Sequence, residues 1–239
     1  MSLIDKFKRK YRKAVKRIKK IRLRPISVFL FHQVSDTFDE TTMKKGDWSS
    51  TGQFKHNMEV LQKEYCFIPL DQAYTRMKKD IFRFRKYAVL TSDDGWASLK
   101  NVLPWLKEKG IPVTLFLNPG YFDGQHFRVK ETEKYLLKAD IDALAQMYPN
   151  VTIGSHGWEH NRATEQSVVE FRQSVKASVE ALNSYSNYVP FFAYTYGSSN
   201  PETDEVLQGF GLVPVMIDRE KNVDVISLVH RELIDGITL

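Results

Sequence analysis

YAVLTSDDG, residues 87–95, and VTIGSHGWEH, residues 151–160, are the two stretches that decide the fold of this 239-residue chain. Each begins as a short apolar, β-rich run and ends at polar side chains, which are Asp93 and Asp94 in the first and His156 and His160 in the second. In parallel α/β sheets and barrels, the side chains that carry function stand at the carboxyl ends of strands. The two stretches therefore predict an α/β fold with acids and imidazoles at strand ends.

On both sides of these two stretches, strand-like and helix-like segments alternate along the chain. Strands are expected at residues 26–31, 87–90, 112–117, 151–153, 191–194, 212–217 and 225–229. Helices are expected at residues 51–65, 71–77, 96–109, 131–147 and 164–183, and from residue 201 onward. Repeated βα units of this kind imply a parallel sheet, which we expect to curl into a barrel.

Composition indicates one catalytic unit. The chain is 42% hydrophobic and 13% aromatic, enough for one sizeable core at this length and short for two independent domains. No Pro/Ser/Gly-rich linker and no repeat divides it, so we expect a tail at residues 1–24 and one catalytic domain at residues 25–239. Cys66, the single cysteine, is expected to be a small buried thiol without chemistry.

Charge is distributed very unevenly along the sequence. Residues 1–24 hold twelve Lys or Arg against Asp5 alone, whereas the rest of the chain holds 23 basic and 28 acidic residues. The pI of about 9.2 therefore describes the tail. A nucleic-acid-binding function based on overall charge is the weakest hypothesis, and no nucleic-acid partner is expected.

Apolar residues in the tail recur at spacings of three and four, which on a helix would form a narrow stripe among the positive charges. Such a basic amphipathic helix suits an anionic membrane surface, and a solvated arm or a basic nucleic-acid tail is the open alternative. The sequence shows no signal-peptide core and no run long enough to span a membrane. We expect a cytoplasmic protein, held peripherally at the inner membrane face if the tail binds lipid.

Neither polar cluster is decisive alone, since Asp93-Asp94-Gly95 can be a turn and a histidine pair is often structural. Together they offer two imidazoles and a carboxylate to one metal ion, with a second carboxylate left to act as a base. A zinc-like ion in such a site acidifies water and polarises an amide carbonyl. His32 is the imidazole available as an acid at another strand end, although a packed histidine remains an equally good interpretation of this residue alone.

The order of the motifs resembles the polysaccharide deacetylases of the NodB-homology class. TSDDG at residues 91–95 resembles their Thr-Phe-Asp-Asp-Gly motif, GSHGWEH at residues 154–160 their Gly-Ser-His-x-x-x-His motif, and FAYTYG at residues 192–197 their third motif. VFLFHQVS at residues 28–35 is similar to the N-terminal segment of the permuted members that deacetylate poly-N-acetylglucosamine. The resemblance implies a distorted (β/α) barrel.

The resemblance also implies roles for individual residues. Asp93 would be the general base, and Asp94, His156 and His160 would bind one divalent ion, Zn²⁺ in the first place and Co²⁺ or Ni²⁺ as alternatives. His32 would be the general acid, in preference to His230, which lies near the end of the chain, where the non-permuted members keep theirs.

The second and third motifs each add one substrate-binding residue. The backbone N–H of Tyr196 would stabilise the oxyanion, and Trp158, between the two metal histidines, would contact the sugar. Three positions depart from the family pattern: Ser92 replaces Phe, Thr195 replaces Pro, and Ala193 stands where many members have an arginine that orients the catalytic aspartate. Arg162 and Arg231 are the candidates to substitute for that arginine, and a surface ion pair is the simpler interpretation of both.

The leading hypothesis is hydrolysis of N-acetyl groups on a GlcNAc-type polysaccharide or its precursor. One alternative keeps this chemistry but acts on a lipid-linked sugar at the cytoplasmic membrane face. Another, motivated by Ala193, is an inactive relative that only binds carbohydrate.

Overall fold

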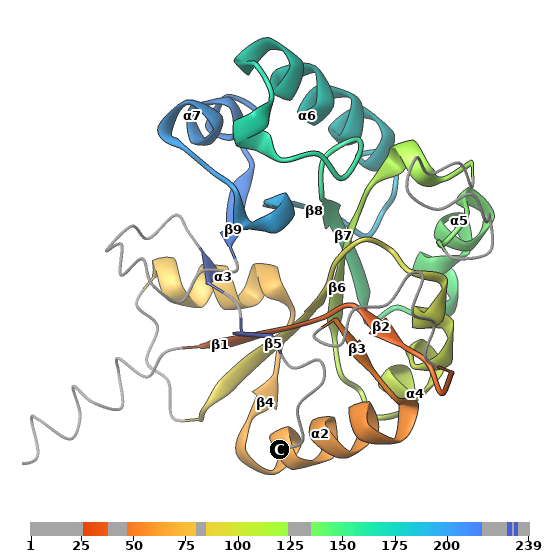
Figure 1. Ribbon diagram of the computed structural model, residues 1–239. Coiled ribbons are helices and arrows are strands. Elements are labelled where there is room, and N and C mark those ends of the chain that lie inside the picture. The colour runs from red at the N-terminus through yellow and green to blue at the C-terminus, as the bar shows by residue number, and fades with distance from the viewer. Residues whose placement is uncertain are drawn as a thin grey trace, which may run out of the picture.

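The computed structural model describes residues 26–37, 47–79, 85–123 and 135–216, together with the backbone of residues 229–230 and 232–233. A parallel sheet forms its centre, with strand order β10-β9-β8-β7-β6-β5-β1-β11 (Figure 1). These strands are β1 (Ser27–Phe31), β5 (Tyr87–Ser92), β6 (Val113–Leu117), β7 (Val151–Ser155), β8 (Tyr188–Ala193), β9 (Val213–Met216), β10 (Val229–His230) and β11 (Glu232–Leu233). Three two-residue strands make two further parallel pairings: β4 (Cys66–Phe67) pairs with β5, and β2 (Gln33–Val34) pairs with β3 (Trp48–Ser49).

The two ends of this strand order lie one residue apart in the sequence. β10 pairs with β9 through His230 and Met216, and β11 pairs with β1 through Leu233 and Leu30, all in parallel. The pairing path therefore returns to β1, and the sheet is the curled sheet of a distorted barrel. This confirms the α/β barrel expected from the repeated βα units.

The helices surround this sheet in Figure 1. They are α2 (Thr51–Glu64), α3 (Leu70–Lys78), α4 (Leu103–Glu108), α5 (Lys138–Met147), α6 (Val168–Leu182) and α7 (Pro201–Gly209). The expected start of α2 is confirmed, because the Ser50 side chain accepts a hydrogen bond from the backbone N–H of Gln53. The start of α7 is confirmed as well, with Asn200 as its N-cap and Pro201 at its first position.

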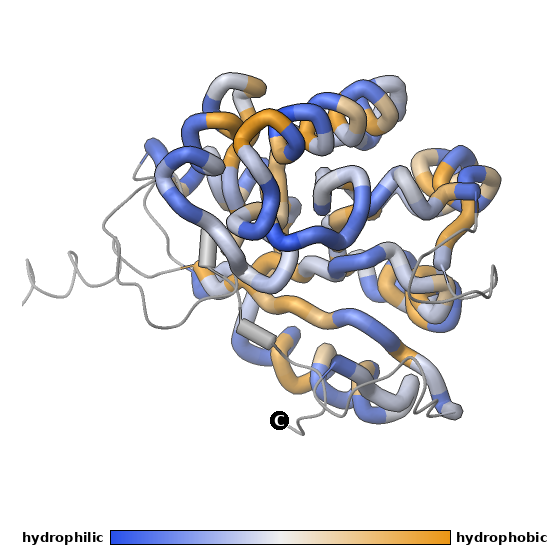
Figure 2. Tube along the Cα trace, turned by 45° about the horizontal axis from the view of Figure 1, so that its top comes forward, coloured by the Kyte–Doolittle hydropathy of each residue, from blue (hydrophilic) through white to orange (hydrophobic). Residues whose placement is uncertain are grey.

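Alternate residues of the strands enter different hydrophobic clusters, as the two-residue period of a strand requires. In β1, Phe29 and Phe31 belong to a cluster with residues of α2, α4 and α5, whereas Val28 belongs to a second cluster with α3. A third cluster joins α6 and α7 to the end of β8 through Phe192. Figure 2 shows the result, with helices that alternate hydrophobic and hydrophilic residues around apolar strands.

The prediction of one helix at residues 96–109 is wrong for its first half. Residues Ala97–Asn101 form a 3₁₀ helix, and α4 begins only at Leu103. Pro104 explains the break, because proline has no N–H to continue a preceding helix and fits best in a first turn.

Two other helices are shorter than expected. Of the helix expected at residues 131–147, residues 131–134 lie outside the described residues, and Tyr135 forms a β-bridge with Trp96 instead of a helical turn. The helix expected from Thr164 begins at Val168, since Ser167 caps it and Glu170 bonds back to the cap. Cys66 is only half-buried, contrary to the expectation.

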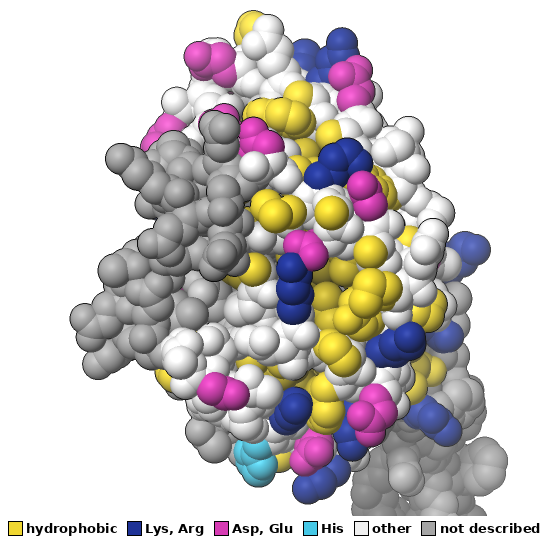
Figure 3. All heavy atoms as spheres, turned by 90° about the vertical axis from the view of Figure 1, so that its right-hand side faces the viewer, with side chains coloured by type: hydrophobic (Ala, Val, Ile, Leu, Met, Phe, Trp, Pro, Cys, Tyr) yellow, Lys and Arg dark blue, Asp and Glu magenta, His cyan; other side chains and the backbone are white. Residues whose placement is uncertain are grey.

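Among the described residues, no helix combines the length and apolar character needed to cross a membrane. The tail at residues 1–24 and most of the strand expected at residues 225–229 lie outside the described residues. On the face that Figure 3 shows, Lys and Arg side chains are interspersed with Asp and Glu, with no single basic patch.

Candidate active site

Asp94, His156 and His160 meet at the carboxyl ends of β5 and β7. Each offers one ligand atom, and the three atoms lie within 4.8 Å of one another. Oδ1 of Asp94 is 3.1 Å from Nε2 of His160 and 3.4 Å from Nε2 of His156. β6 separates the two strands in the sheet, and its parallel pairing with both brings their ends to one edge. The structure therefore brings together the three residues that were predicted from the sequence to be metal ligands.

The tautomer of the neutral His156 ring follows from its hydrogen bond. Nδ1 lies 2.7 Å from the backbone carbonyl oxygen of Ala193, which can only accept, so Nδ1 carries a proton. In the neutral ring, Nε2 then keeps its lone pair and faces the carboxylate of Asp94. An Nδ1–H bonded to a backbone carbonyl is the usual support for a metal-binding imidazole.

Oδ1 of Asp94 is buried and lacks a well-formed hydrogen bond among the described residues, although two imidazole nitrogens face it. Burial by itself raises the pKa of this carboxyl, but the charges and side-chain contacts of His160 and His156 outweigh it and hold the pKa well below its usual range. A cation between this carboxylate and the imidazoles would give Oδ1 the partner that it lacks. A divalent cation fits this donor set of two nitrogens and one oxygen.

Asp93 lies beside this group and is 1% exposed. Its Oδ2 is 4.0 Å from Nε2 of His156. The backbone of Asp94 has a φ of 69°, and Gly95 follows with 72°. In an extended strand, two consecutive side chains point to opposite faces of the sheet. This left-handed turn instead brings the carboxylates of Asp93 and Asp94 to the same imidazole.

The second oxygen of Asp94 is held by a neighbouring indole. Nε1 of Trp96 donates to Oδ2 of Asp94 at 3.0 Å, which leaves Oδ1 toward the imidazoles. Trp96 is in turn stacked on Tyr135, with ring centroids 4.5 Å apart. Trp96 was assigned no role from the sequence, and this orienting contact was missed.

The loop that carries both histidines is anchored by side chains from other segments. The amide of Asn118 donates to the carbonyl oxygens of His156 and Gly157, at 2.7 and 3.3 Å. The backbone N–H of His160 donates to the hydroxyl of Tyr121 at 2.8 Å. Asn118 directly follows β6, and its place after an apolar strand was the one sequence signal that could have revealed it.

His32 follows the last residue of β1, as Asp93 follows the last residue of β5. The two strands pair in parallel, with Phe31 opposite Ser92. His32 and Asp93 are therefore at matching positions on neighbouring strands, and His32 is half-buried. Of the alternative acid, His230, only the backbone is described, and it pairs with the last residue of β9.

Tyr196 and Trp158 stand at the rim of the site, each 37% exposed. The Tyr196 ring meets the His160 ring edge-on at 4.6 Å, and its backbone has a φ of 55°. Asp94 and Tyr196 are the two non-glycine residues with positive φ in the described part of the chain. Backbone strain of this kind concentrates at functional sites.

With this geometry in place, comparison with known families gives a direct result. The sequence model of the polysaccharide deacetylase family matches residues 83–215, more than half of the chain. The chain belongs to the polysaccharide deacetylase family. No curated protein sequence matches it.

Solved structures of deacetylases share the fold. A deacetylase of Streptococcus pyogenes, PplD, solved with acetate, has a TM-score of 0.71 at 17% identity, over 88% of this chain and 92% of that one. IcaB from Ammonifex degensii has a TM-score of 0.71 at 18% identity, over 88% and 92%. A de-N-acetylase from Aggregatibacter actinomycetemcomitans has a TM-score of 0.69 at 16% identity, over 89% and 96%. The chain thus has the NodB-type barrel of polysaccharide deacetylases.

The departure at Ala193 has a partial structural explanation. Ala193 supports the site through its backbone, whose carbonyl oxygen accepts from His156. Arg162 does not replace the missing arginine of the family, since its side chain contacts Glu165 and the Tyr196 ring. Arg231 lies outside the described residues.

Proposed function

We propose that this polysaccharide deacetylase is a metal-dependent hydrolase that removes N-acetyl groups from a GlcNAc-type glycan or its precursor. The observation that carries the proposal is the group of three ligand atoms within 4.8 Å, with the buried carboxylate of Asp93 beside it. A module that only bound sugar would have no use for a second buried carboxylate next to a complete ligand set. Nothing in the geometry favours the inactive alternative.

Asp94, His156 and His160 would hold the divalent ion, Zn²⁺ before Co²⁺ or Ni²⁺. When bound, such an ion supplies Lewis acidity to the acetamido carbonyl and lowers the pKa of water. The residues around it would supply proton transfer and positioning.

Asp93 is the proposed general base. Its carboxylate takes a proton from the water whose oxygen forms the new bond to the acetamido carbon. The carbonyl oxygen gains negative charge at this step, and the backbone N–H of Tyr196 is the proposed donor to it. The strained φ of Tyr196 holds this N–H in a fixed direction without further reorganisation.

His32 is the proposed general acid. When the C–N bond breaks, the sugar nitrogen needs a proton to leave as an amine, and the imidazole of His32 would donate it. The products are acetate and the free amino sugar. The matching positions of His32 and Asp93 on β1 and β5 support an acid and a base at one site. Trp158 is the proposed apolar contact for the sugar ring.

The test is acetate release from N-acetylglucosamine oligomers by purified protein, with and without added Zn²⁺. We expect release that requires metal and that falls at least a hundredfold in Asp93→Asn, since general base catalysis contributes about 10²–10⁴-fold. Asp71→Asn is the matched control because Asp71 is exposed on α3. Full activity in Asp93→Asn would refute the assigned mechanism.

A membrane-associated substrate is the second candidate, and the basic tail is the observation that favours it. Twelve Lys or Arg within residues 1–24 would attract anionic lipid, and a lipid-linked sugar would then reach the site at the cytoplasmic face. Deletion of residues 1–24 should abolish binding to anionic vesicles while acetate release from soluble oligomers persists. Nucleic acid that displaced the chain from vesicles at equal charge would instead support a nucleic-acid tail.

A further inference from the structure

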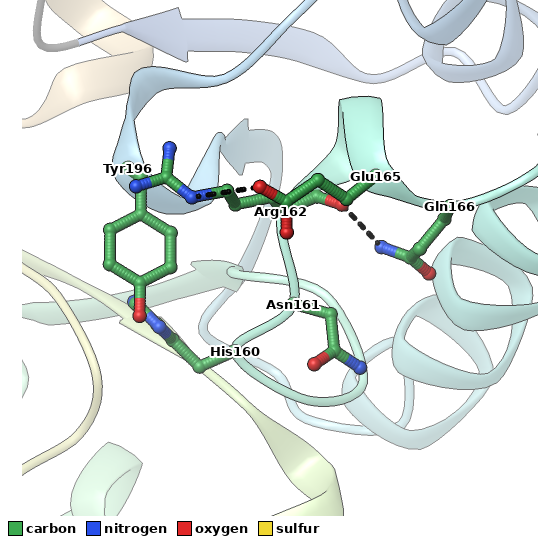
Figure 4. Close-up of a pocket in the computed structure, with 6 residues that line it drawn as sticks. All are labelled: His160, Asn161, Arg162, Glu165, Gln166 and Tyr196. Carbon is green, nitrogen blue, oxygen red and sulfur yellow. Dashed lines mark hydrogen bonds and ion pairs between the residues drawn. The ribbon is translucent and has the colours of Figure 1, made fainter.

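A hollow of about 360 Å³ opens beside the candidate metal site. Its lining is mostly polar and comes from the loop after β7 and from the third motif: His160, Asn161, Arg162, Glu165, Gln166 and Tyr196 (Figure 4). This volume lies within the range of small-ligand sites and suits one sugar-sized group. None of the roles assigned above uses Arg162, Glu165 or Gln166.

Arg162 is held in the hollow by its neighbours. Its guanidinium lies over the Tyr196 ring, 4.1 Å from the ring centroid, and its Nε is 3.4 Å from a carboxylate oxygen of Glu165. The side-chain amide of Gln166 donates to the backbone carbonyl of Arg162, as Figure 4 shows. The contacts with Tyr196 and Glu165 orient the guanidinium, and the bond from Gln166 holds the backbone at Arg162.

The other edge of the guanidinium has the fork needed to bind an oxyanion. Nε is the guanidinium atom nearest to Glu165, and in Figure 4 the two terminal nitrogens lie on the side of the guanidinium away from that carboxylate. Two parallel N–H groups of arginine match the two oxygens of a carboxylate or a phosphate. Glu165 does not cancel the positive charge of Arg162, because water screens an ion pair whose side chains are 72% and 42% exposed, for Glu165 and Arg162 respectively.

The Tyr196 ring connects this fork to the reaction site. The centroid of this ring is 4.1 Å from the guanidinium carbon of Arg162 and 4.6 Å from the centroid of the His160 ring. A substrate whose acetamido group is at His160 would therefore place a neighbouring sugar, or a substituent, against Arg162.

We infer that the hollow is a substrate subsite for an oxyanion, a carboxylate or phosphate carried by the glycan next to the acetylated sugar, with Arg162 as its ligand. This inference rests on the proposed deacetylase function and narrows its substrate class to acidic N-acetylated glycans. It also gives Glu165 a function, as the group that orients Arg162 and weakens its attraction for anions.

Calorimetric titration of the metal-loaded full chain carrying Asp93→Asn, which slows hydrolysis during the titration, tests the inference with three disaccharides. In each, N-acetylglucosamine is joined to glucose, to glucuronic acid or to glucose 6-phosphate, so that the last two arms separate a carboxylate from a phosphate. We expect the preferred acidic disaccharide to bind about tenfold more tightly than the neutral one. Equal binding of all three would overturn the inference.

Variants of Arg162 and Glu165 test whether a preference for the acidic disaccharides depends on Arg162. Arg162→Met should bring the ratio of acidic to neutral affinity close to one, Arg162→Lys should keep part of it, and Glu165→Gln should increase it. Arg172→Met is the control, since Arg172 is exposed on α6 and outside the hollow. An unchanged ratio in both Arg162 variants would overturn the assignment.

Acetate release from the same disaccharides separates this inference from the function on which it rests. If acetate is released but the acidic and neutral disaccharides bind with equal affinity, the subsite is refuted and the deacetylase function stands. An affinity ratio that depends on Arg162, without release from any of the three, would refute the deacetylase and leave an acidic-glycan site.

Discussion

Nδ1 of His156 is 2.7 Å from the carbonyl oxygen of Ala193, a contact that joins the loop after β7 to the end of β8. It turns Nε2, with its lone pair, toward Asp94. Residues from different strands meet only in the folded chain, so an ion that binds Asp94, His156 and His160 should stabilise the fold.

The first prediction concerns this stabilisation. At free Zn²⁺ of 100 times Kd, the free energy of unfolding should rise by about 2.7 kcal/mol, and a chelator should reverse the rise. His156→Ala should abolish the effect, whereas His56→Ala on α2 should retain it. Differential scanning calorimetry measures it, and an equal rise in His156→Ala would contradict the ligand assignment.

The second prediction concerns the indole that orients Asp94. Trp96→Phe keeps an aromatic ring against Tyr135 but removes the hydrogen bond to Oδ2 of Asp94. We expect Zn²⁺ affinity to fall about tenfold or more, the usual effect of losing a group that supports a ligand. Trp105→Phe on α4 is the matched control. A competition assay with a zinc indicator would show whether Trp96 is only packing, in which case both variants bind equally.

The third prediction uses two glycines with opposite surroundings. A Cβ at Gly154 in β7 would lie 2.7 Å from the Phe116 ring and 3.0 Å from the carbonyl oxygen of Phe191, so Gly154→Ala should lower the free energy of unfolding by about 1–3 kcal/mol. A Cβ at Gly52 in α2 would meet nothing within 4 Å, so Gly52→Ala should raise it by up to about 1 kcal/mol. Urea midpoints of the two variants should move in opposite directions.

The fourth prediction concerns the capping box of α6. Hydrogen bonds from the Ser167 side chain and backbone lower the pKa of Glu170 below its ordinary 4.5. A lowered pKa in the folded state means that this stabilisation is fully present above pH 4.5 and is lost as the pH falls through the lower folded-state pKa.

Glu170→Gln tests this, because glutamine keeps an acceptor oxygen and removes the titration. The variant should lose less stability than the parent chain between pH 5 and pH 3 in urea titrations. Glu180→Gln, also on α6, should follow the parent chain. A variant whose pH dependence equals that of the parent would show that the cap does not titrate in this range.

Much of the fold was predictable because its signals are local. The apolar run before Asp93 defines β5, and the cap at Ser50 defines the start of α2. Errors arose where distant contacts override helix propensity, as at Tyr135, which pairs with Trp96 across about 40 residues. β4 was missed because two residues are too few for a periodic signal.

The candidate site was predictable in its residue types and only partly in its supports. Asp94, His156 and His160 follow strands in the sequence, so parallel pairing alone brings them together. Asn118 and Tyr121 hold the histidine loop through hydrogen bonds from about 40 residues away, and no local pattern indicates such pairs.

The return of the pairing path to β1 sets an order for folding. Strands β5 to β9 each pair with a strand near in the sequence, whereas Leu30 meets Leu233 across about 200 residues. Closing so long a loop is entropically costly and slow. We therefore expect β1 to gain its second neighbour, β11, last, and His32 at its end to be the final part of the reaction site to become rigid.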